Sequence, residues 1–492
     1  MPPIGLLRAS RHPTIASLLA VLGLTLAPTA HAAPPDEGEC PTVSGGSTGP
    51  SEDGEQPRDA VSVTLREGMV LTADDLLILR QLVPKEIWAH RDVFFFEGMR
   101  MEIGPCYRRY PIPGFYKEAT AKHAAEVELG KDGSLSGYRA GLPFPPESID
   151  LEDDDAAARW AWNLELRFRG GGHRGHFRIV DFPDRMGSIL TYEGDFFLLP
   201  TTGRADLPEQ GYSIGTGDHL WVAGGRFTKP FSVRHVAWRQ FRAKSALESF
   251  QEPDDTFVYV PEMRKSRRAS TSWVDGMYFP TYAVAEQGGG GPVSFGSGLG
   301  GINPTASRSA AVTTHAYRGL EGLSLRPNAY HWRVRGTQDV LAPINAVRPG
   351  FPESRDRNFG PAGLSVASDR WEPRHAVVIE GAIRRPDEGI RTVTYWIDYQ
   401  TQQPLFRLTR TAKRRLLEIQ IFVHRFTGDQ LDYPEWPGGV PALVFEPVAQ
   451  VSYDAIHGGG GWRRESYDLR SLPFDESELP GLTSAAALDR GR

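Results

Sequence analysis

The sequence predicts a mainly β protein with flanking helices, an α+β architecture built on one large curved antiparallel sheet. Short alternating apolar runs recur between residues 177 and 453, and Asp, Gly, Pro and Gln clusters separate them. The chain is also rich in aromatic residues, with 11 Trp, 24 Phe and 16 Tyr, many of which fall on these runs. Many short strands bounded by turn signals are typical of a single sheet that curves or closes on itself.

The first segment predicts export. Arg8 and Arg11 precede an apolar run at residues 15–27, and Ala30-His31-Ala32 supplies a small-x-small cleavage signal, so residues 1–32 are interpreted as a signal peptide. Residues 33–58 are rich in Pro, Gly, Ser and acids, which predicts a disordered lead. No later run approaches the roughly 20 apolar residues of a transmembrane helix, so no transmembrane segment is expected.

Residues 59–455 are expected to form one domain whose N-terminal part, residues 59–170, is largely helical. Residues 60–65 and 93–101 have strand composition, whereas Thr72 is a helix N-cap followed by acids in the first turn. Residues 116–128 and 156–166 predict two further helices.

Strands are predicted over the rest of this domain, at residues 177–180, 188–199, 233–241, 256–260, 329–334, 375–381, 392–399, 405–411, 416–423 and 443–453. Glycine- and turn-rich segments at 285–315 and 349–361 predict flexible insertions, and residues 456–492 a C-terminal extension.

The charge balance and the cysteine content limit the possible partners and compartment. The chain carries 55 Lys and Arg against 61 Asp and Glu, a net charge of −6, which argues against a nucleic-acid partner. Cys40 and Cys106 are the two cysteines of the sequence. In an exported protein, such a pair favours one disulfide that ties the N-terminal tail to the domain, with two free thiols as the alternative.

Residues 254–268 (DDTFVYVPEMRKSRR) combine a strand with a cluster of cations. Both faces of the strand are apolar, and Pro261 is expected to mark its end because proline cannot donate to the ladder. The cations that follow are expected at the rim of an apolar interior, where they would bind an anionic head group: Arg264, Lys265, Arg267 and Arg268. The alternative is a core strand followed by a solvated basic loop.

Aromatic residues recur on strand after strand and predict an apolar, ligand-binding cavity on the concave face of the sheet. The candidate lining residues are Trp238, Phe241, Phe257, Tyr259, Tyr330, Trp332, Tyr395 and Trp396. The alternative is that these side chains form an ordinary packed core.

Motifs for covalent chemistry are not found in the sequence. The pair His173 and His176 has no HExxH helix or cysteine set behind it, and no Gly-x-Ser-x-Gly elbow follows a predicted strand. We therefore assign no catalytic residue, expect no metal or cofactor, and do not predict an enzyme. A carbohydrate-active or other hydrolase on a β scaffold remains an alternative, because carboxylate pairs are spatial rather than sequential.

Several short blocks resemble a known family. Leu142-Pro143-Phe144-Pro145 followed by Ala161-Trp162-Asn163 resembles the GLPFP … iAWN signature of an uncharacterised proteobacterial family of exported proteins, similar to outer-membrane lipoprotein-sorting proteins. Later blocks resemble the same family: Val233-Arg234-His235, Asp254-Asp255-Thr256, Tyr259-Val260-Pro261-Glu262-Met263-Arg264, Tyr330-His331-Trp332, Ala342-Pro343-Ile344-Asn345 and Trp371-Glu372-Pro373-Arg374. His235 stands where glycine is usual, and Lys265-Ser266 interrupts the family's arginine run.

Trp396-Ile397-Asp398 with Gln403-Pro404-Leu405 resembles a hairpin of the lipoprotein carriers LolA and LolB. The resemblance implies a half-open antiparallel barrel wrapped on helices, with an apolar cavity, located in the periplasm or at the periplasmic face of the outer membrane. It also implies resistance-nodulation-division (RND) exporters and a companion outer-membrane protein as partners. Together these observations predict a non-enzymatic carrier or accessory protein for a lipid or other hydrophobic ligand; a scaffold component of an envelope export complex is the alternative.

Overall fold

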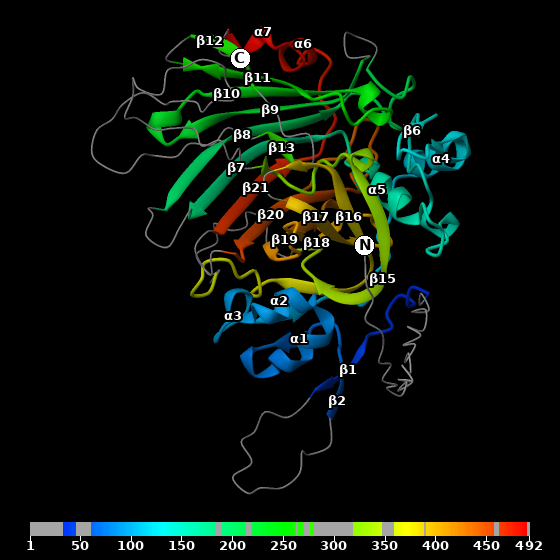
Figure 1. The fold of residues 1–492 in the computed structure, drawn as a ribbon, viewed down its shortest axis with the longest axis vertical. Coiled ribbons are helices and arrows are strands. Elements are labelled where there is room, and N and C mark those ends of the chain that lie inside the picture. Colours follow the sequence, from blue (N-terminus) through cyan, green and yellow to red (C-terminus); the bar gives the residue numbers. More distant parts are fainter. Residues whose placement is uncertain are drawn as a thin grey trace, which may run out of the picture.

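The computed structural model describes residues 33–45, 61–182, 189–212, 218–261, 264–269, 276–278, 318–346, 359–387, 390–456 and 462–489 (Figure 1). The predicted signal peptide, the second half of the predicted lead and the predicted insertion at 285–315 lie outside these residues, as does the insertion at 349–361 up to residue 358. Among the helices described, none is both long and apolar enough to cross a membrane.

One 15-stranded sheet organises the molecule. Its strands, in hydrogen-bonding order, are β12 (Lys265–Ala269), β11 (Asp255–Val260), β10 (Ala237–Ala243), β9 (His219–Lys229), β8 (Leu190–Pro200), β7 (His173–Phe182), β21 (Trp462–Arg470), β20 (Phe445–Asp454), β19 (Leu416–Phe426), β18 (Pro404–Arg410), β17 (Ile390–Asp398), β16 (Arg370–Asp387), β4 (Met101–Ile103) and β3 (Val70–Leu71). A further strand, β15 (Tyr330–Ala342), also pairs with β16. The pairs are antiparallel except for β16 with β4. Each strand predicted between residues 177 and 453 overlaps a strand of this sheet, so the predicted fold class is confirmed.

The C-terminal strand β21 joins the two halves of the sheet. It pairs with β7 along its whole length, from Trp462 opposite Phe182 to Arg470 opposite Arg174, and with β20 on its other side. Residues 462–470 are therefore an inner strand, and the interpretation of residues 456–492 as a C-terminal extension is corrected here. The sequence gives little sign of this strand, because charged residues fill much of WRRESYDLR.

The sheet curves around helix α5 (Ala156–Leu166), as Figure 1 shows. This helix touches strands that are far apart in the sheet: Glu165 pairs with Arg242 of β10 at 3.3 Å, and the ring of Trp160 lies 5.4 Å from that of Tyr399 at the end of β17. The two outer strands, β12 and β3, remain unpaired to each other, so the sheet is curved without closing into a barrel.

Helices α1 (Leu76–Leu82), α2 (Lys85–Ala89) and α3 (Arg91–Phe94) cover the other face of the sheet over β16–β20. The predicted cap at Thr72 is confirmed: its backbone N–H donates to Asp75 Oδ2 at 2.9 Å, although the first turn is a 3-10 helix. The strand predicted at residues 93–101 is wrong. Phe94, Phe95 and Phe96 are buried where α3 ends, so tertiary packing overrides their strand propensity.

The short elements complete the molecule. Strand β1 (Thr42–Gly45) lies within the predicted disordered lead and pairs with β2 (Val61–Thr64). The others are η1 (Ala73–Asp75), α4 (Gly114–His123), η2 (Ala124–Glu126), β5 (Glu128–Leu129), β6 (Leu135–Ser136), η3 (Pro146–Ser148), η4 (Phe231–Val233), η5 (Lys244–Leu247), β13 (Met277–Tyr278), β14 (Arg318–Gly319), η8 (Pro327–Ala329), η9 (Thr427–Asp429), α6 (Leu479–Leu482) and α7 (Ala486–Asp489).

Candidate functional site

Within the part of the chain that the structure describes, side chains pack densely inside the curved sheet. Trp238, Tyr330 and Tyr395 are almost fully buried in the core that surrounds α5. Two cavities beside Arg167, near the end of α5, measure only about 50 and 10 Å³. Among the described residues, side chains of the sheet, of α5 and of residues 320–329 pack together where the sequence predicts a cavity on the concave face.

A group of charges is buried in this filled interior. Asp254 accepts hydrogen bonds from Arg242 Nε at 3.0 Å and from Gln240 Nε2 at 2.7 Å, and it also pairs with Arg326. Burial raises the pKa of Asp254. The two guanidinium groups and the hydrogen bonds lower it by more, so the pKa lies below its ordinary value. These charges compensate one another and hold β10, the segment before β11 and the segment before β15 together.

The remaining predicted aromatic residues do not meet in one cavity. Trp396 lies in the opposite core, beneath α1–α3, and its Nε1 donates to Gln338 Oε1 at 2.8 Å. Phe241 and Phe257 pack against each other with ring centroids 6.1 Å apart in a third cluster, and Tyr259 and Trp332 are half-buried on their strands.

The predicted cationic rim forms an edge strand. Lys265, Arg267 and Arg268 belong to β12, and Arg264 lies in the turn before it. Arg268 pairs with Asp255 of the neighbouring strand, and Ser266 of β12 donates to the carboxylate of Asp489 in α7. Charged residues are typical of an exposed sheet edge, where they oppose strand addition. The alternative of a solvated basic loop is therefore corrected for residues 265–269, which form a strand, and β11 ends before Pro261 as predicted.

An open pocket of about 530 Å³ lies elsewhere, between α4, the segment that leads into α5 and the turn after β17. Its walls are mainly apolar and aromatic. The lining residues are Pro34, Pro35, Tyr107, Arg109, Ile112, Tyr116, Lys117, Thr120, Ala121, Leu142, Pro145, Pro146, Glu147, Arg374, His375, Asp398, Tyr399, Gln400 and Gln402. None of the predicted cavity or rim residues is among them.

The segment Gly141–Pro146 packs closely on α4 and forms one wall. Gly141 has a φ of +81°, and a Cβ at this position would lie 2.5 Å from the backbone nitrogen of Thr120, so only glycine fits. Leu142 N–H donates to Thr120 Oγ1 at 2.9 Å. Asn163 of α5 holds the other end of the segment, because its Oδ1 accepts from Phe144 N–H at 3.1 Å. The GLPFP and AWN motifs thus meet in space to build this wall.

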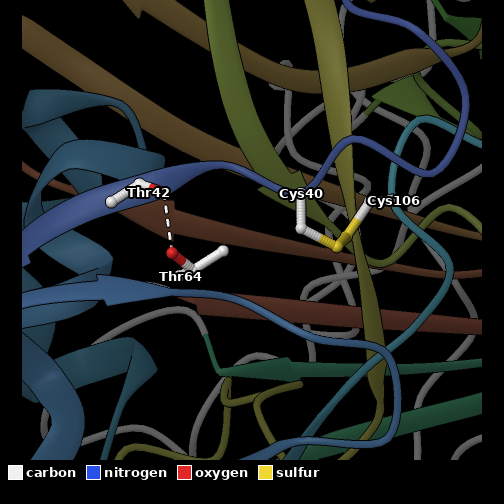
Figure 2. Close-up of a disulfide and its surroundings, with 4 residues drawn as sticks. All are labelled: Cys40, Thr42, Thr64 and Cys106. Atoms are coloured by element: carbon white, nitrogen blue, oxygen red, sulfur yellow. Dashed lines mark hydrogen bonds between the residues drawn. A yellow bond between two sulfur atoms is a disulfide. The ribbon is translucent and has the colours of Figure 1, made fainter.

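The N-terminal segment forms a second wall, and Figure 2 shows the disulfide that anchors this segment. Cys40 and Cys106 form a disulfide, which confirms the predicted pairing. Next to it, Gly38 N–H donates to the carbonyl of Cys106 at 2.9 Å, and Arg109 N–H donates to Glu37 Oε1 at 2.9 Å. These contacts hold Pro34 and Pro35 against the pocket.

The polar floor of the pocket carries a paired charge. The guanidinium of Arg374 donates to both carboxylate oxygens of Asp398, at 2.7 and 3.0 Å, and its Nη1 donates to the carbonyl of Arg108 at 2.6 Å. Burial lowers the pKa of Arg374, but the charge and hydrogen bonds of Asp398 raise it to a net upward shift. This pair leaves no excess charge on the floor of the pocket.

A histidine lies beside this pair. His375 of β16 is directly opposite Asp339 of β15, and the two side chains are 2.8 Å apart between Nδ1 and Oδ1. The Tyr107 hydroxyl also donates to Asp339; burial first, and then this carboxylate, raise the pKa of Tyr107. The His375 ring packs edge-on against Tyr399, with centroids 6.0 Å apart. Within the part of the chain that the structure describes, no cluster of three or more His, Cys, Asp or Glu residues could hold a metal ion.

Sequence reasoning missed this pocket because its residues come from α4, from β16, from the end of β17 and from several loops, which only the fold brings together. A signal was present, however, in the blocks that carry the family resemblance. Leu142 and Pro145 come from the first block, Arg374 ends Trp371-Glu372-Pro373-Arg374, and Asp398 ends Trp396-Ile397-Asp398. Motifs that are more than 200 residues apart in the sequence therefore meet in this pocket.

Comparison with known proteins supports the resemblance. Residues 93–283 match DUF1329, a protein family of unknown function. The resemblance inferred from the sequence is thereby confirmed. The DUF1329 match begins in α3 and includes α4, α5 and β7–β12, so it contains the pocket wall built by Gly141–Pro146 but not Arg374 or Asp398.

Solved structures show a distant likeness. A domain from Vibrio parahaemolyticus provisionally described as an outer membrane lipoprotein-sorting protein is 13% identical, covers 69% of this chain and 100% of that chain, and has a TM-score of 0.37. A DUF1329 protein from Desulfovibrio piger is 12% identical over 68% of this chain and 98% of that chain, with a TM-score of 0.39. A LolA superfamily protein from Nitrosomonas europaea is 12% identical over 66% of this chain and 96% of that chain, with a TM-score of 0.31. No curated protein matches the sequence.

Proposed function

We propose that this protein binds a lipid or other hydrophobic ligand in the pocket beside α4 and acts as a non-enzymatic carrier or accessory protein of the cell envelope. The pocket itself carries this proposal. Its volume of about 530 Å³ is that of a small-molecule site, and its apolar walls with a few placed polar groups are what such sites use.

The composition of the walls indicates the class of ligand. Ile112, Leu142, Pro145 and Pro146 supply aliphatic surface, and Tyr116 supplies aromatic surface from α4. Apolar area of this kind gains free energy when it leaves water, at roughly 25 cal/mol per Å². The charged groups Arg109, Lys117 and Glu147 are exposed, so they lie at the surface of the pocket rather than in its depth. An amphiphile with its apolar part inside fits this distribution.

The compartment is proposed on two grounds. The N-terminal sequence has the pattern of a signal peptide, and the Cys40–Cys106 disulfide is of the kind that persists in oxidising compartments such as the bacterial periplasm. The disulfide fixes a wall of the pocket, so an oxidising environment would also maintain the binding site.

The test is to purify the protein without detergent from its native envelope and to analyse the organic extract by mass spectrometry. We expect a stoichiometric hydrophobic compound. A variant that fills the pocket, Ala121→Trp, should lose that compound, because Ala121 lines the pocket. Ala125→Trp is the matched control: Ala125 is exposed close by in η2 and does not line the pocket.

A fluorescent amphiphile provides the second measurement. Its affinity should fall at least tenfold in Ala121→Trp and stay within about twofold in Ala125→Trp. An empty extract together with equal probe binding by both variants would contradict the proposal.

A further inference from the structure

The pocket contains a buried nitrogen without a hydrogen-bond partner. His375 lines the pocket, its side chain is only 6% exposed, and its Nε2 is buried with no partner among the residues that the structure describes. Buried polar atoms in folded proteins nearly always have a partner, which is a protein group, a water molecule or a ligand. An unpaired nitrogen in the wall of a pocket therefore points to a group that the ligand supplies.

The surroundings of His375 determine what this nitrogen can recognise. A carboxylate only accepts hydrogen bonds, so the Nδ1 of His375, 2.8 Å from Asp339 Oδ1, is the donor. In the neutral imidazole ring, the other nitrogen is then an acceptor. Tyr107 and the position of Asp339 directly across the strand pair hold the carboxylate in place, so this tautomer is built into the fold.

The neighbouring charges limit the head group further. Arg374 is paired with Asp398 and also donates to a backbone carbonyl, so it has no unbalanced charge to offer an anionic group. Asp339 is engaged by His375 and Tyr107. Among the described residues that line the pocket, the buried polar atom left without a partner is thus His375 Nε2, which in the neutral ring is an acceptor and selects a hydrogen-bond donor.

We propose that His375 Nε2 accepts a hydrogen bond from a hydroxyl group of the bound ligand, so that the pocket selects neutral hydroxylated amphiphiles, such as long-chain or polycyclic alcohols, over their ethers and over fatty acids. This inference rests on the proposed function, since it names the polar end of the ligand that the pocket binds. The sequence predicted that basic residues, most of them on the outer strand β12, would bind the head group. We instead assign recognition of the polar end of the ligand to one imidazole nitrogen in the pocket.

The test compares three probes of one chain length: 1-dodecanol, dodecyl methyl ether and dodecanoate. Each is titrated against the full-length protein carrying a displaceable fluorescent amphiphile. One neutral hydrogen bond corresponds to roughly a five- to tenfold preference, so the wild type should bind the alcohol about that much more tightly than the ether. Dodecanoate should bind more weakly than the alcohol.

Two variants assign the preference to the ring nitrogen. His375→Phe removes the acceptor and should bind alcohol and ether equally, with its affinity for the ether within about twofold of the wild type. His375→Gln retains an acceptor and should keep part of the preference. Thermal unfolding of each variant checks that it is folded. An unfolded variant would also lose its affinity for the ether, whereas loss of the hydrogen bond alone would not change that affinity.

The outcomes distinguish this inference from the proposed function. Equal binding of alcohol and ether by the wild type, tightest binding of dodecanoate, or an undiminished preference in His375→Phe would overturn the role of His375 while leaving the carrier proposal standing. Failure of all three probes, combined with an empty native extract, would instead overturn the proposed function.

Discussion

Two aromatic regions of this molecule have opposite properties. Around α5, the rings of Trp160, Trp238 and Tyr395 are buried on all sides, and the cavities nearby are about 50 and 10 Å³. Beside α4, Tyr116 and Tyr399 border an open pocket of about 530 Å³. A high density of aromatic residues therefore indicates apolar surface that is removed from water. It does not indicate whether the protein core or a ligand buries that surface.

The difference arises from the backbone that carries the rings. Strands of a regular sheet lie about 4.8 Å apart and present a side chain to the same face at every second residue, so large rings fill the space between the sheet and α5. The pocket is bounded by segments that cannot close in the same way. Pro145 and Pro146 have fixed φ angles and lack an N–H, and the disulfide holds Pro34 and Pro35 in place. This contrast leads to four predictions.

The largest expected effect belongs to a ring in the filled region. Trp238→Ala should lower the free energy of unfolding by about 3–5 kcal/mol, because the ring is fully buried and a cavity would remain. A Cβ atom on Gly225 would lie only 2.4 Å from the edge of the Trp238 ring, so the ring packs directly against the glycine backbone. Urea unfolding followed by fluorescence and circular dichroism measures the change.

Tyr399→Ala in the pocket is the matched comparison. Tyr399 is only partly buried, so this variant should lose less than about 2 kcal/mol. Equal losses for the two variants would show that the two regions do not differ in packing as described.

The next effect concerns the buried charges. Asp254→Asn should cost about 3 kcal/mol, because it removes the carboxylate that compensates Arg242 and Arg326 in the interior. The pKa of Asp254 is lower in the folded protein than in the unfolded chain, where an aspartate has a pKa near 4. The ionised carboxylate therefore stabilises the fold fully above about pH 4, and this stabilisation is lost as the pH falls from there through the folded-state pKa. The stability difference between wild type and variant should thus be full at pH 7 and shrink below about pH 4.

The neighbouring residue provides the control for Asp254→Asn. Asp255 pairs with Arg268 at the exposed edge of the sheet, so Asp255→Asn should cost less than about 1 kcal/mol and be sensitive to salt. A difference for Asp254→Asn that is the same at pH 7 and at pH 3 would contradict the assigned linkage.

The same contrast explains what could be predicted from the sequence. Alternation of apolar residues located the strands from β7 to β20 almost completely, because each of them buries at least one face. β9 was missed, since Gly224 and Gly225 break its pattern, and β12 and β21 were missed, since they are rich in charged residues. The disulfide followed from composition and compartment.

The site could not be located in the same way. Its residues lie on α4, on β16, at the end of β17 and on loops and a turn, and only the three-dimensional fold brings Leu142 next to Tyr399 and Arg374. The aromatic pattern pointed instead to Trp238 and Tyr395, which are large because they fill the core. The glycine and asparagine of the GLPFP and AWN motifs were the informative residues, because Gly141 and Asn163 position a pocket wall without lining it.

A third prediction tests the wall that the disulfide holds. Cys40→Ser combined with Cys106→Ser should lower the free energy of unfolding by about 2–4 kcal/mol, since the bridge closes a loop of 66 residues. It should also weaken binding of a fluorescent amphiphile, because Pro34 and Pro35 are no longer fixed at the pocket. In the filled region no such coupling is expected: Trp238→Ala should change stability far more than affinity. Unchanged binding in the double variant would show that the N-terminal segment does not form part of the functional site.

The smallest expected effect concerns a single hydrogen bond in the pocket wall. Thr120→Val leaves Leu142 N–H without its acceptor and should cost about 1 kcal/mol. Thr42→Val, which removes the exposed 2.8 Å bond to Thr64 Oγ1, is the control and should cost about half as much or less. Thr120 sits at the close contact with Gly141, so its loss should also move the Leu142 wall and alter affinity for an amphiphile. If stability falls but affinity does not, the wall has a structural role only, and the binding surface is confined to the opposite side formed by Tyr399 and His375.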